Sequence, residues 1–395
     1  MAKRIYLDYA SLTPVDPRVL REMKRFSAPE FANPSSIYNE GVAAKKALEV
    51  ARKSICEFIH AHSDEIVFTS GGTEANGLAL EGAGRAALRA LGKAGMKGPK
   101  PHLIISAIEH SSIMECAAML EKNGVEVTRL PVDKNGVVSL GELKKAIRLQ
   151  TFMVSIMTVN NEIGSVQPIR EIAKVIRDAK KQRSKEGNIG PYYPLFHTDA
   201  AQAALYEDLN VEKLGVDLLT LDGSKVYGPR GIGALYVKRG TPVEPIIYGG
   251  GQERGLRSGT ENLSGIAGFA KALEIARKSR AKEIIRVQAL KEQFLRGLQG
   301  IRSDIIVNGN QSAVSSPHIL SVSIPGIDNE FFVLQLDARD IACSTKSSCL
   351  RDAEESYVLK AIGADSRTSV RFSFGRWTKP RDVKKAILAI SKILC

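Results

Sequence analysis

The sequence of 395 residues is 44% hydrophobic and 25% charged, which is the composition of a globular protein. No apolar run approaches the roughly 18 residues of a membrane span. The first residues also lack the apolar core of a signal peptide, so we expect a cytoplasmic protein without a membrane partner. The net charge of +13 comes without zinc-finger or aromatic-interleaved basic motifs. It therefore favours a solvated basic surface over direct nucleic-acid binding, with an acidic or tRNA-modifying protein partner left open.

The helical and strand patterns alternate between about residues 45 and 240. Strands are predicted over 65–70, 102–108, 125–130, 152–159, 194–198, 218–221 and 233–237, and helices over 41–61, 140–149 and 169–183. Strands separated by helices require crossover connections, which predicts an α/β fold with a mainly parallel sheet and helices on both faces. Such a sheet binds its ligand at the carboxyl ends of its strands.

The chain is too long for one ordinary core. A glycine-rich segment at 249–260 is followed by a helical pattern over 263–299 and an α+β remainder. We therefore predict a large domain over residues 15–260, and a smaller α+β domain made of residues 1–14 plus 261–395.

Gly72 and Thr73 lie between a predicted strand and a predicted helix. Free backbone N–H groups at a helix N-terminus, together with a small hydroxyl, suit a phosphate. An ordinary N-cap threonine is the alternative interpretation. The sequence has no G-x-G-x-x-G or Walker A motif, so neither a dinucleotide nor a nucleoside triphosphate is favoured.

Three further predicted strands end at polar side chains. Asp199 can pair with a protonated pyridine nitrogen and keep a cofactor ring electron-poor, or it can be a helix N-cap. His110 can stack on a flat ring and move protons, or it can mark a capped strand-to-helix junction. Asn161 can reach a ring hydroxyl.

Lys225 follows the apolar strand predicted over residues 218–221 and precedes a Gly/Pro-rich turn. A lysine nucleophile needs such a partly desolvated place, because burial lowers the pKa of its amine. Taken alone, Lys225 is more simply a solvated surface charge. Combined with the polar strand ends, it indicates pyridoxal 5'-phosphate (PLP).

With these residues, the chain resembles the cysteine desulfurases of the aminotransferase class V family, which are PLP enzymes of fold type I. The resemblance covers nearly the whole sequence, from Tyr6-Leu-Asp-Tyr-Ala10 to Ser369–Arg376. It includes Asn33-Pro-Ser-Ser36, Phe68–Glu74, Val159–Gly164 and Arg257–Asn262. The resemblance is to desulfurases of the housekeeping and nitrogen-fixation type.

The resemblance implies a role for each residue at the cofactor ring. Lys225 would hold the cofactor aldehyde covalently, Asp199 would pair with the pyridine nitrogen, and His110 would lie over the ring. Gln202 and Asn161 would lie near the ring hydroxyl.

The resemblance also implies contacts at the two ends of the bound molecules. Thr73 and Ser224 would contact the cofactor phosphate, joined by Thr260 from the neighbouring subunit, which implies a homodimer. Arg371 would bind the substrate carboxylate through its bidentate fork, assisted by Asn33.

Cysteine usage agrees with this chemistry. The five cysteines include no CxxC pair, which indicates a reducing compartment and argues against a structural zinc site, so no metal is expected. Cys349 ends the serine-rich run Ser344-Thr-Lys-Ser-Ser-Cys349, which resembles the mobile catalytic loop of the family in the small domain. Lys346 would favour its thiolate. The implied reaction converts L-cysteine to L-alanine and leaves sulfur on Cys349 as a persulfide, which passes to an acceptor protein for iron–sulfur cluster assembly or tRNA thiolation.

The sequence departs from the family before the lysine, where the usual Ser-x-His is replaced by Asp222 and Ser224. Asp222 would repel a phosphate if it pointed inward, so we expect it to turn away or to be offset by Arg257. The sequence also ends at Cys395 without the longer tail that housekeeping members use to dock the iron–sulfur scaffold, which leaves the acceptor open.

Three alternatives remain at this point. A selenocysteine lyase shares the PLP pocket. An ordinary aminotransferase needs no mobile cysteine, so Cys349 argues against it. A catalytically impaired, basic binding homologue is favoured by Asp222 and Ser224 but not by the intact Lys225.

Overall fold

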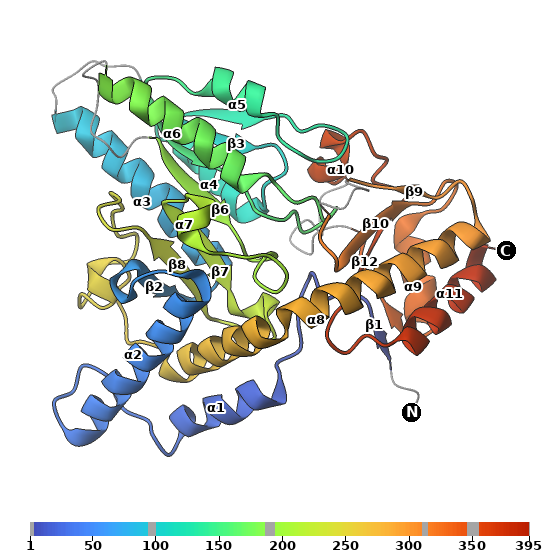
Figure 1. Ribbon diagram of the computed structural model, residues 1–395, viewed down its shortest axis with the longest axis horizontal. Helices are drawn as coiled ribbons and strands as arrows, with labels where there is room; N and C mark the ends of the chain where they lie inside the picture. The colour runs from blue at the N-terminus through green and yellow to red at the C-terminus, as the bar shows by residue number, and fades with distance from the viewer. Residues whose placement is uncertain (1–3, 94–99, 186–193, 310–314, 346–354, 395) are drawn as a thin grey trace.

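The computed structural model describes residues 4–93, 100–185, 194–309, 315–345 and 355–394 (Figure 1). A seven-stranded sheet forms the centre of its larger part. The strand order is β2 (Ile66–Thr69), β8 (Gly233–Val237), β7 (Leu218–Asp222), β6 (Leu195–Asp199), β5 (Thr151–Ser155), β3 (His102–Ser106), β4 (Glu126–Leu130). The strands from β7 to β4 pair in parallel, and β8 is antiparallel to both of its neighbours. The predicted α/β class with a mainly parallel sheet is confirmed.

Alternate residues of each strand enter different cores, because successive side chains of a strand point to opposite faces. Val67 packs with α3 (Gly72–Lys93) and α4 (Ser111–Lys122). Ile66 and Phe68 pack on the other face, which is covered by five helices. These are α2 (Asn39–Ile59), α5 (Leu140–Ala146), α6 (Ile169–Lys185), α7 (Val211–Leu214) and the first half of α8 (Leu263–Ile301).

Several elements are shorter than the sequence predicts, most of all β5 and α5. β5 ends at Ser155 rather than 159, because the chain turns there and the side chain of Asn160 accepts from the backbone N–H groups of Glu162 and Ile163. α5 ends at Ala146 rather than 149, where Ile147 takes up extended backbone.

A second core lies at the other end of the molecule. There β1 (Ile5–Tyr6) pairs in parallel with β11 (Ile341–Ala342), and an antiparallel sheet has the order β12 (Ser369–Ser373), β10 (Ile319–Ser323), β9 (Ile306–Val307). The helices of this part are α9 (Asn329–Asp337), α10 (Tyr357–Ala361) and α11 (Pro380–Leu394). The rings of Phe294, Phe372 and Phe374 meet in this core, with centroids 4.8 and 5.5 Å apart.

Helix α8 is 39 residues long and runs from one core into the other (Figure 1). Phe269 and Leu273 of its first half are buried with Ile66 and Phe68 in the large core on one face of the seven-stranded sheet, against which α1 (Pro17–Ser27) also packs. Phe294 and Leu298 of its second half belong to the small core at the other end of the molecule. The first half of α8 therefore packs in the large core and the second half in the small core. Within the described ranges, no helix has the length and apolar content needed to cross a membrane.

Candidate active site

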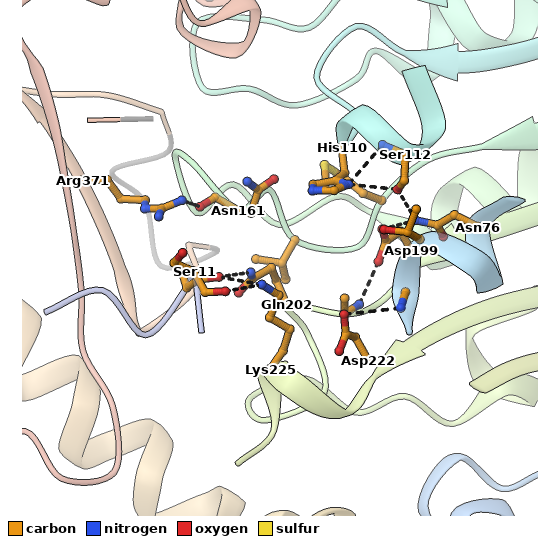
Figure 2. A pocket seen from close by; sticks show the side chains of 16 residues that line it. Ser11, Asn76, His110, Ser112, Asn161, Asp199, Gln202, Asp222, Lys225 and Arg371 are labelled. Carbon is orange, nitrogen blue, oxygen red and sulfur yellow. Dashed lines mark hydrogen bonds between the residues drawn. The ribbon is translucent and has the colours of Figure 1, made fainter. Parts of the chain in front are cut away.

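A cavity of about 190 Å³ lies at the carboxyl ends of the parallel strands (Figure 2). Asp199 ends β6, Lys225 follows β7 in the short helix η2 (Gly223–Lys225), and His110 precedes α4 after β3. The cavity is lined by Ala10, Ser11, Gly72, Thr73, Asn76, His110, Ser112, Met157, Val159, Asn161, Asp199, Ala201, Gln202, Asp222, Lys225 and Arg371. Parallel strands thus bring together side chains that lie more than 100 positions apart in the sequence.

The Asp199 carboxylate is held by donors from two elements. Its Oδ2 accepts from Asn76 Nδ2 at 2.7 Å, and its Oδ1 accepts from the Ala201 N–H at 2.9 Å. Asn76 Nδ2 also donates to Ser112 Oγ at 2.9 Å, while its buried Oδ1 has no hydrogen-bond partner within the described residues. Asn76 was not predicted from the sequence, although Asn76 lies one helical turn after Thr73 and therefore lies on the same face of the helix.

His110 serves as the N-cap of α4 and also lines the cavity. Its Nδ1 accepts from the Ser112 N–H at 3.2 Å and lies 2.9 Å from Ser112 Oγ. The capping interpretation and the site interpretation are therefore compatible, because the same bond that starts the helix fixes the imidazole ring.

Lys225 is tethered to the segment that follows β1. Its Nζ donates to Ser11 O at 2.5 Å and to Ala10 O at 3.3 Å. Gln202 Nε2 donates to the same Ala10 carbonyl at 2.7 Å. The N-terminal segment therefore forms one wall of the cavity, a contact that strand patterns do not reveal.

Arg371 is almost fully buried, with 2% of its surface exposed. One terminal nitrogen donates to Asn161 O at 2.8 Å and the other to Asp8 Oδ1 at 2.8 Å. Its Nε has no partner among the described residues. The guanidinium is thus fixed at the cavity by an acid from the N-terminal segment.

The predicted nucleophile Cys349 lies outside the described residues. The segment that leads to it is hydrogen-bonded to the cavity wall, because Arg371 N–H donates to Ser344 O at 2.6 Å and Ser344 N–H donates to Arg371 O at 3.1 Å. Cys343, one residue earlier, is a different kind of thiol: burial raises its pKa far above the ordinary value.

At the start of α3, the expectation for Asp222 is wrong. Asp222 lines the cavity instead of turning away. Its Oδ1 accepts from the Ser224 N–H at 2.7 Å, and its Oδ2 accepts from the Gly72 N–H at 3.4 Å. Arg257 does not offset it, because the guanidinium pairs with Glu74 at 2.9 Å.

Three predicted site residues do not line this cavity. Asn33 is exposed and its Oδ1 accepts from the Ser35 N–H at 2.9 Å. Thr260 is also exposed. Ser224 contributes its carbonyl oxygen to Thr13, whose N–H and hydroxyl donate to it at 3.0 and 2.7 Å.

The family model for aminotransferase class V matches residues 5–386, and the chain belongs to this family. Among curated proteins, it is 40% identical to a cysteine desulfurase, IscS, of Dictyoglomus turgidum over all of this chain and 95% of the relative. It is also 40% identical to the mitosomal cysteine desulfurase of Encephalitozoon cuniculi, over 99% of this chain and 88% of the relative.

Solved structures agree with the family assignment. A NifS-like protein superposes with a TM-score of 0.87 at 32% identity, covering 99% of both chains. A structure of SspA in complex with cysteine superposes with a TM-score of 0.75 at 34% identity, covering 94% of this chain and 98% of that one.

Enzymes of this family use PLP, and the cavity residues fit that cofactor. An amine that can hold its aldehyde, Lys225, and a carboxylate that can pair with its pyridine nitrogen, Asp199, line the same space. The unpartnered buried Asn76 Oδ1 and Arg371 Nε are polar atoms without partners in the described protein, as expected where a polar molecule binds.

Proposed function

We propose that this protein is a PLP-dependent cysteine desulfurase. The observation that carries the proposal is the convergence of Lys225, Asp199, His110 and Arg371 on one cavity, to whose wall the segment preceding Cys349 is hydrogen-bonded. The relatives that are named cysteine desulfurases match the chain over nearly its whole length. An ordinary aminotransferase would have no use for a catalytic cysteine.

The residues at the cofactor ring take the roles that the family resemblance assigns. Lys225 holds the aldehyde, Asp199 pairs with the pyridine nitrogen, and His110 lies over the ring. Gln202 and Asn161 bind near the ring hydroxyl. When bound, PLP supplies an electron sink that stabilises negative charge at the substrate α-carbon. Asn76 keeps the Asp199 carboxylate oriented toward the ring through its 2.7 Å hydrogen bond.

The ends of the bound molecules are held by other groups. Gly72 and Thr73 bind the phosphate at the start of α3, with Ser224 nearby and Thr260 supplied by a partner subunit of a homodimer. Arg371 binds the carboxylate of L-cysteine, and its charge-assisted hydrogen bonds give the site its substrate class. Asn33 lies outside the cavity in an exposed turn, so it would have to move to assist Arg371.

Two protein groups carry out the remaining steps. Once the substrate amine has replaced it on the cofactor aldehyde, Lys225 Nζ would take the proton from the substrate α-carbon, and the Cys349 thiolate would attack the substrate sulfur. The balance is L-cysteine plus the Cys349 thiol giving L-alanine plus a Cys349 persulfide, with no external oxidant or reductant. The persulfide sulfur then passes to an acceptor protein, which is an iron–sulfur scaffold or a tRNA-thiolation protein.

The two cysteines of one small segment provide the test. Cys349→Ala should lower alanine formation from L-cysteine by about a thousandfold or more, because the sulfur has no protein acceptor. Cys343→Ala is the matched control, since desolvation of this partly buried thiol raises its pKa and keeps it protonated, and the variant should retain near-normal turnover. Both variants should show the visible absorbance of a lysine-bound PLP. Normal sulfur transfer by Cys349→Ala, or a wild-type protein that stays colourless with added PLP, would refute the proposal.

A further inference from the structure

An acidic side chain is bound to the helix end at which the cofactor phosphate is proposed to bind. Asp222 Oδ2 lies 3.4 Å from the Gly72 nitrogen at the start of α3, and a Cβ added at Gly72 would lie 3.2 Å from the same oxygen. The second oxygen, Oδ1, accepts from the Ser224 N–H at 2.7 Å. The carboxylate is therefore held in place from two sides, by α3 and by η2.

No ion pair to this carboxylate is found within the described residues, although Lys225 and Arg371 line the same cavity. The charged and titratable groups of the surrounding elements all have other partners. Glu74 of α3 pairs with Arg257, Lys225 of η2 donates to two backbone carbonyls, Asp199 of β6 accepts from Asn76, and His110 before α4 contacts Ser112. Asp199 adds a second negative charge to the cavity, and the other cation of its lining, Arg371, pairs with Asp8.

A phosphate bound at this place would compete with Asp222 for the Gly72 N–H donor and would lie close to its negative charge. A phosphate ester has its second ionisation near pH 6, so free PLP carries a dianionic phosphate at pH 7 to 9. Acidic groups held a few ångströms apart cannot all be ionised, and they titrate as a coupled pair that retains a proton.

We infer that Asp222 and the cofactor phosphate share one proton, taken up from solvent on binding, so that PLP affinity falls as pH rises. This inference rests on the proposed function. It makes Asp222 a residue that sets the strength and the pH range of cofactor retention. Its sign follows from the proton count: the complex holds one proton more than the separated partners, so raising the pH favours the separated partners.

The test compares two ligands and two proteins. PLP and pyridoxal, which lacks the phosphate, are titrated into the apo forms of wild type and Asp222→Asn between pH 6 and 9. Asn keeps an acceptor oxygen for the Ser224 N–H but removes the charge. Asp178→Asn, which removes an exposed acid of α6, controls for the change in net charge. Visible absorbance gives Kd, and calorimetry in two buffers of different ionisation enthalpy gives the number of protons taken up.

At pH 8 we expect Asp222→Asn to bind PLP at least about tenfold more tightly than wild type. The ratio of the two Kd values should grow toward tenfold per pH unit as pH rises. Wild type should take up about one proton more than the variant. The pH dependence of the lysine linkage itself is common to both proteins and cancels in the ratio. Pyridoxal should bind wild type and variant alike, and Asp178→Asn should behave as wild type.

Other outcomes would overturn the inference. A Kd ratio that stays constant with pH excludes a shared proton, and an equal change for pyridoxal assigns a structural role to Asp222. If Asp222→Asn fails to fold, Asp222→Ser replaces it, with pyridoxal binding as the check on the pocket. A constant ratio in a protein that still forms alanine from L-cysteine refutes this inference alone. If neither protein binds PLP, both the inference and the proposed function fall.

Discussion

Glu109 is fully buried immediately before His110, and nothing in the proposed chemistry uses it. Its Oε1 accepts from the Met157 N–H at 3.0 Å, and its Oε2 has no partner within the described residues. Burial raises the pKa of this carboxyl to about 8, and the charge of Asp199 adds to the rise, against the hydrogen bonds from Ser106 and Met157. Glu109 is therefore a neutral acid at neutral pH.

This neutral carboxyl should make the folded protein less stable as the pH rises. Below pH 4.5, the ordinary value for Glu, both folded and unfolded chains hold the proton. Between that value and about pH 8, only the folded chain keeps it, so the free energy of unfolding falls by an amount on the order of 4 kcal/mol. Glu109→Gln should remove much of this loss, as measured by urea unfolding at pH 5 and pH 8. An unchanged pH dependence in the variant would mean that Glu109 ionises without cost.

The residues found from the sequence are those that end strands. Asp199, His110 and Lys225 were predicted because the carboxyl ends of parallel strands meet at one edge of a sheet. Asn76 and Asp8 were not, because their contacts to Asp199 and Arg371 join segments 123 and 363 positions apart. The orientation of Asp222 was predicted wrongly: charge repulsion alone suggested that it turns away, whereas two backbone donors hold it in the cavity.

At the scale of elements, the buried Glu253 carboxylate joins the short helix η3 (Glu253–Gly255) to helix α2 by an ion pair and to the sheet by a hydrogen bond. The Glu253 carboxylate lies 2.8 Å from Arg52 of α2 and also accepts from the Phe68 N–H of β2 at 2.8 Å. The side chains of Arg52 and Glu253 are only 4% and 2% exposed. Glu253 and Arg254 have φ values of 46° and 60°, so the carboxylate also holds a segment in the left-handed region.

Replacing Glu253 with Gln should leave the buried Arg52 without its counter-charge. We expect the free energy of unfolding to fall by roughly 3–5 kcal/mol, measured as a lower urea midpoint. Glu49→Gln is the matched control, because Glu49 pairs with the same Arg52 at 3.3 Å but is 52% exposed. That change should cost at most about 1 kcal/mol. Equal effects of the two substitutions would show that burial does not decide the strength of these pairs.

Sequence patterns predicted most elements but not how all of them pair. The strand at 233–237 was expected from its apolar run, whereas its antiparallel pairing with β2 and β7 depends on the Gly/Pro turn that follows Lys225. The pattern over 263–299 indicated a helix. That this helix serves two cores emerges only when its halves are seen packing against different partners.

At the scale of the whole molecule, the proposed homodimer can be tested through Thr260. Thr260→Ala should weaken PLP binding by about ten- to a hundredfold, because it removes a charge-assisted hydrogen bond to the phosphate. Lys225→Ala should remove the visible band of the lysine-bound cofactor. Purified heterodimers with one subunit of each variant show whether Thr260 acts across the subunit interface or within its own subunit.

If Thr260 acts across the interface, the Thr260→Ala subunit keeps its own Lys225 and receives an intact Thr260 from its partner. The heterodimer should then show one site per dimer of wild-type affinity. Only weakened sites would mean that Thr260 acts within its own subunit. A monomeric protein in sedimentation experiments would refute the shared site outright.

The pairing of β1 with β11 has a consequence for how the protein is made. Tyr6 lies beside Ala342, and Asp8 bonds to Arg371, so these two residues find their partners only after more than 300 further residues have been synthesised. At ~5–20 residues per second, this delay is on the order of 20 to 70 s. The strands of the parallel sheet are synthesised before these late partners, so the sheet can form during that time. The carbonyl groups of Ala10 and Ser11, which hold Lys225 in place, settle last. We therefore expect a nascent chain to stay inactive until residues 341–371 have been synthesised.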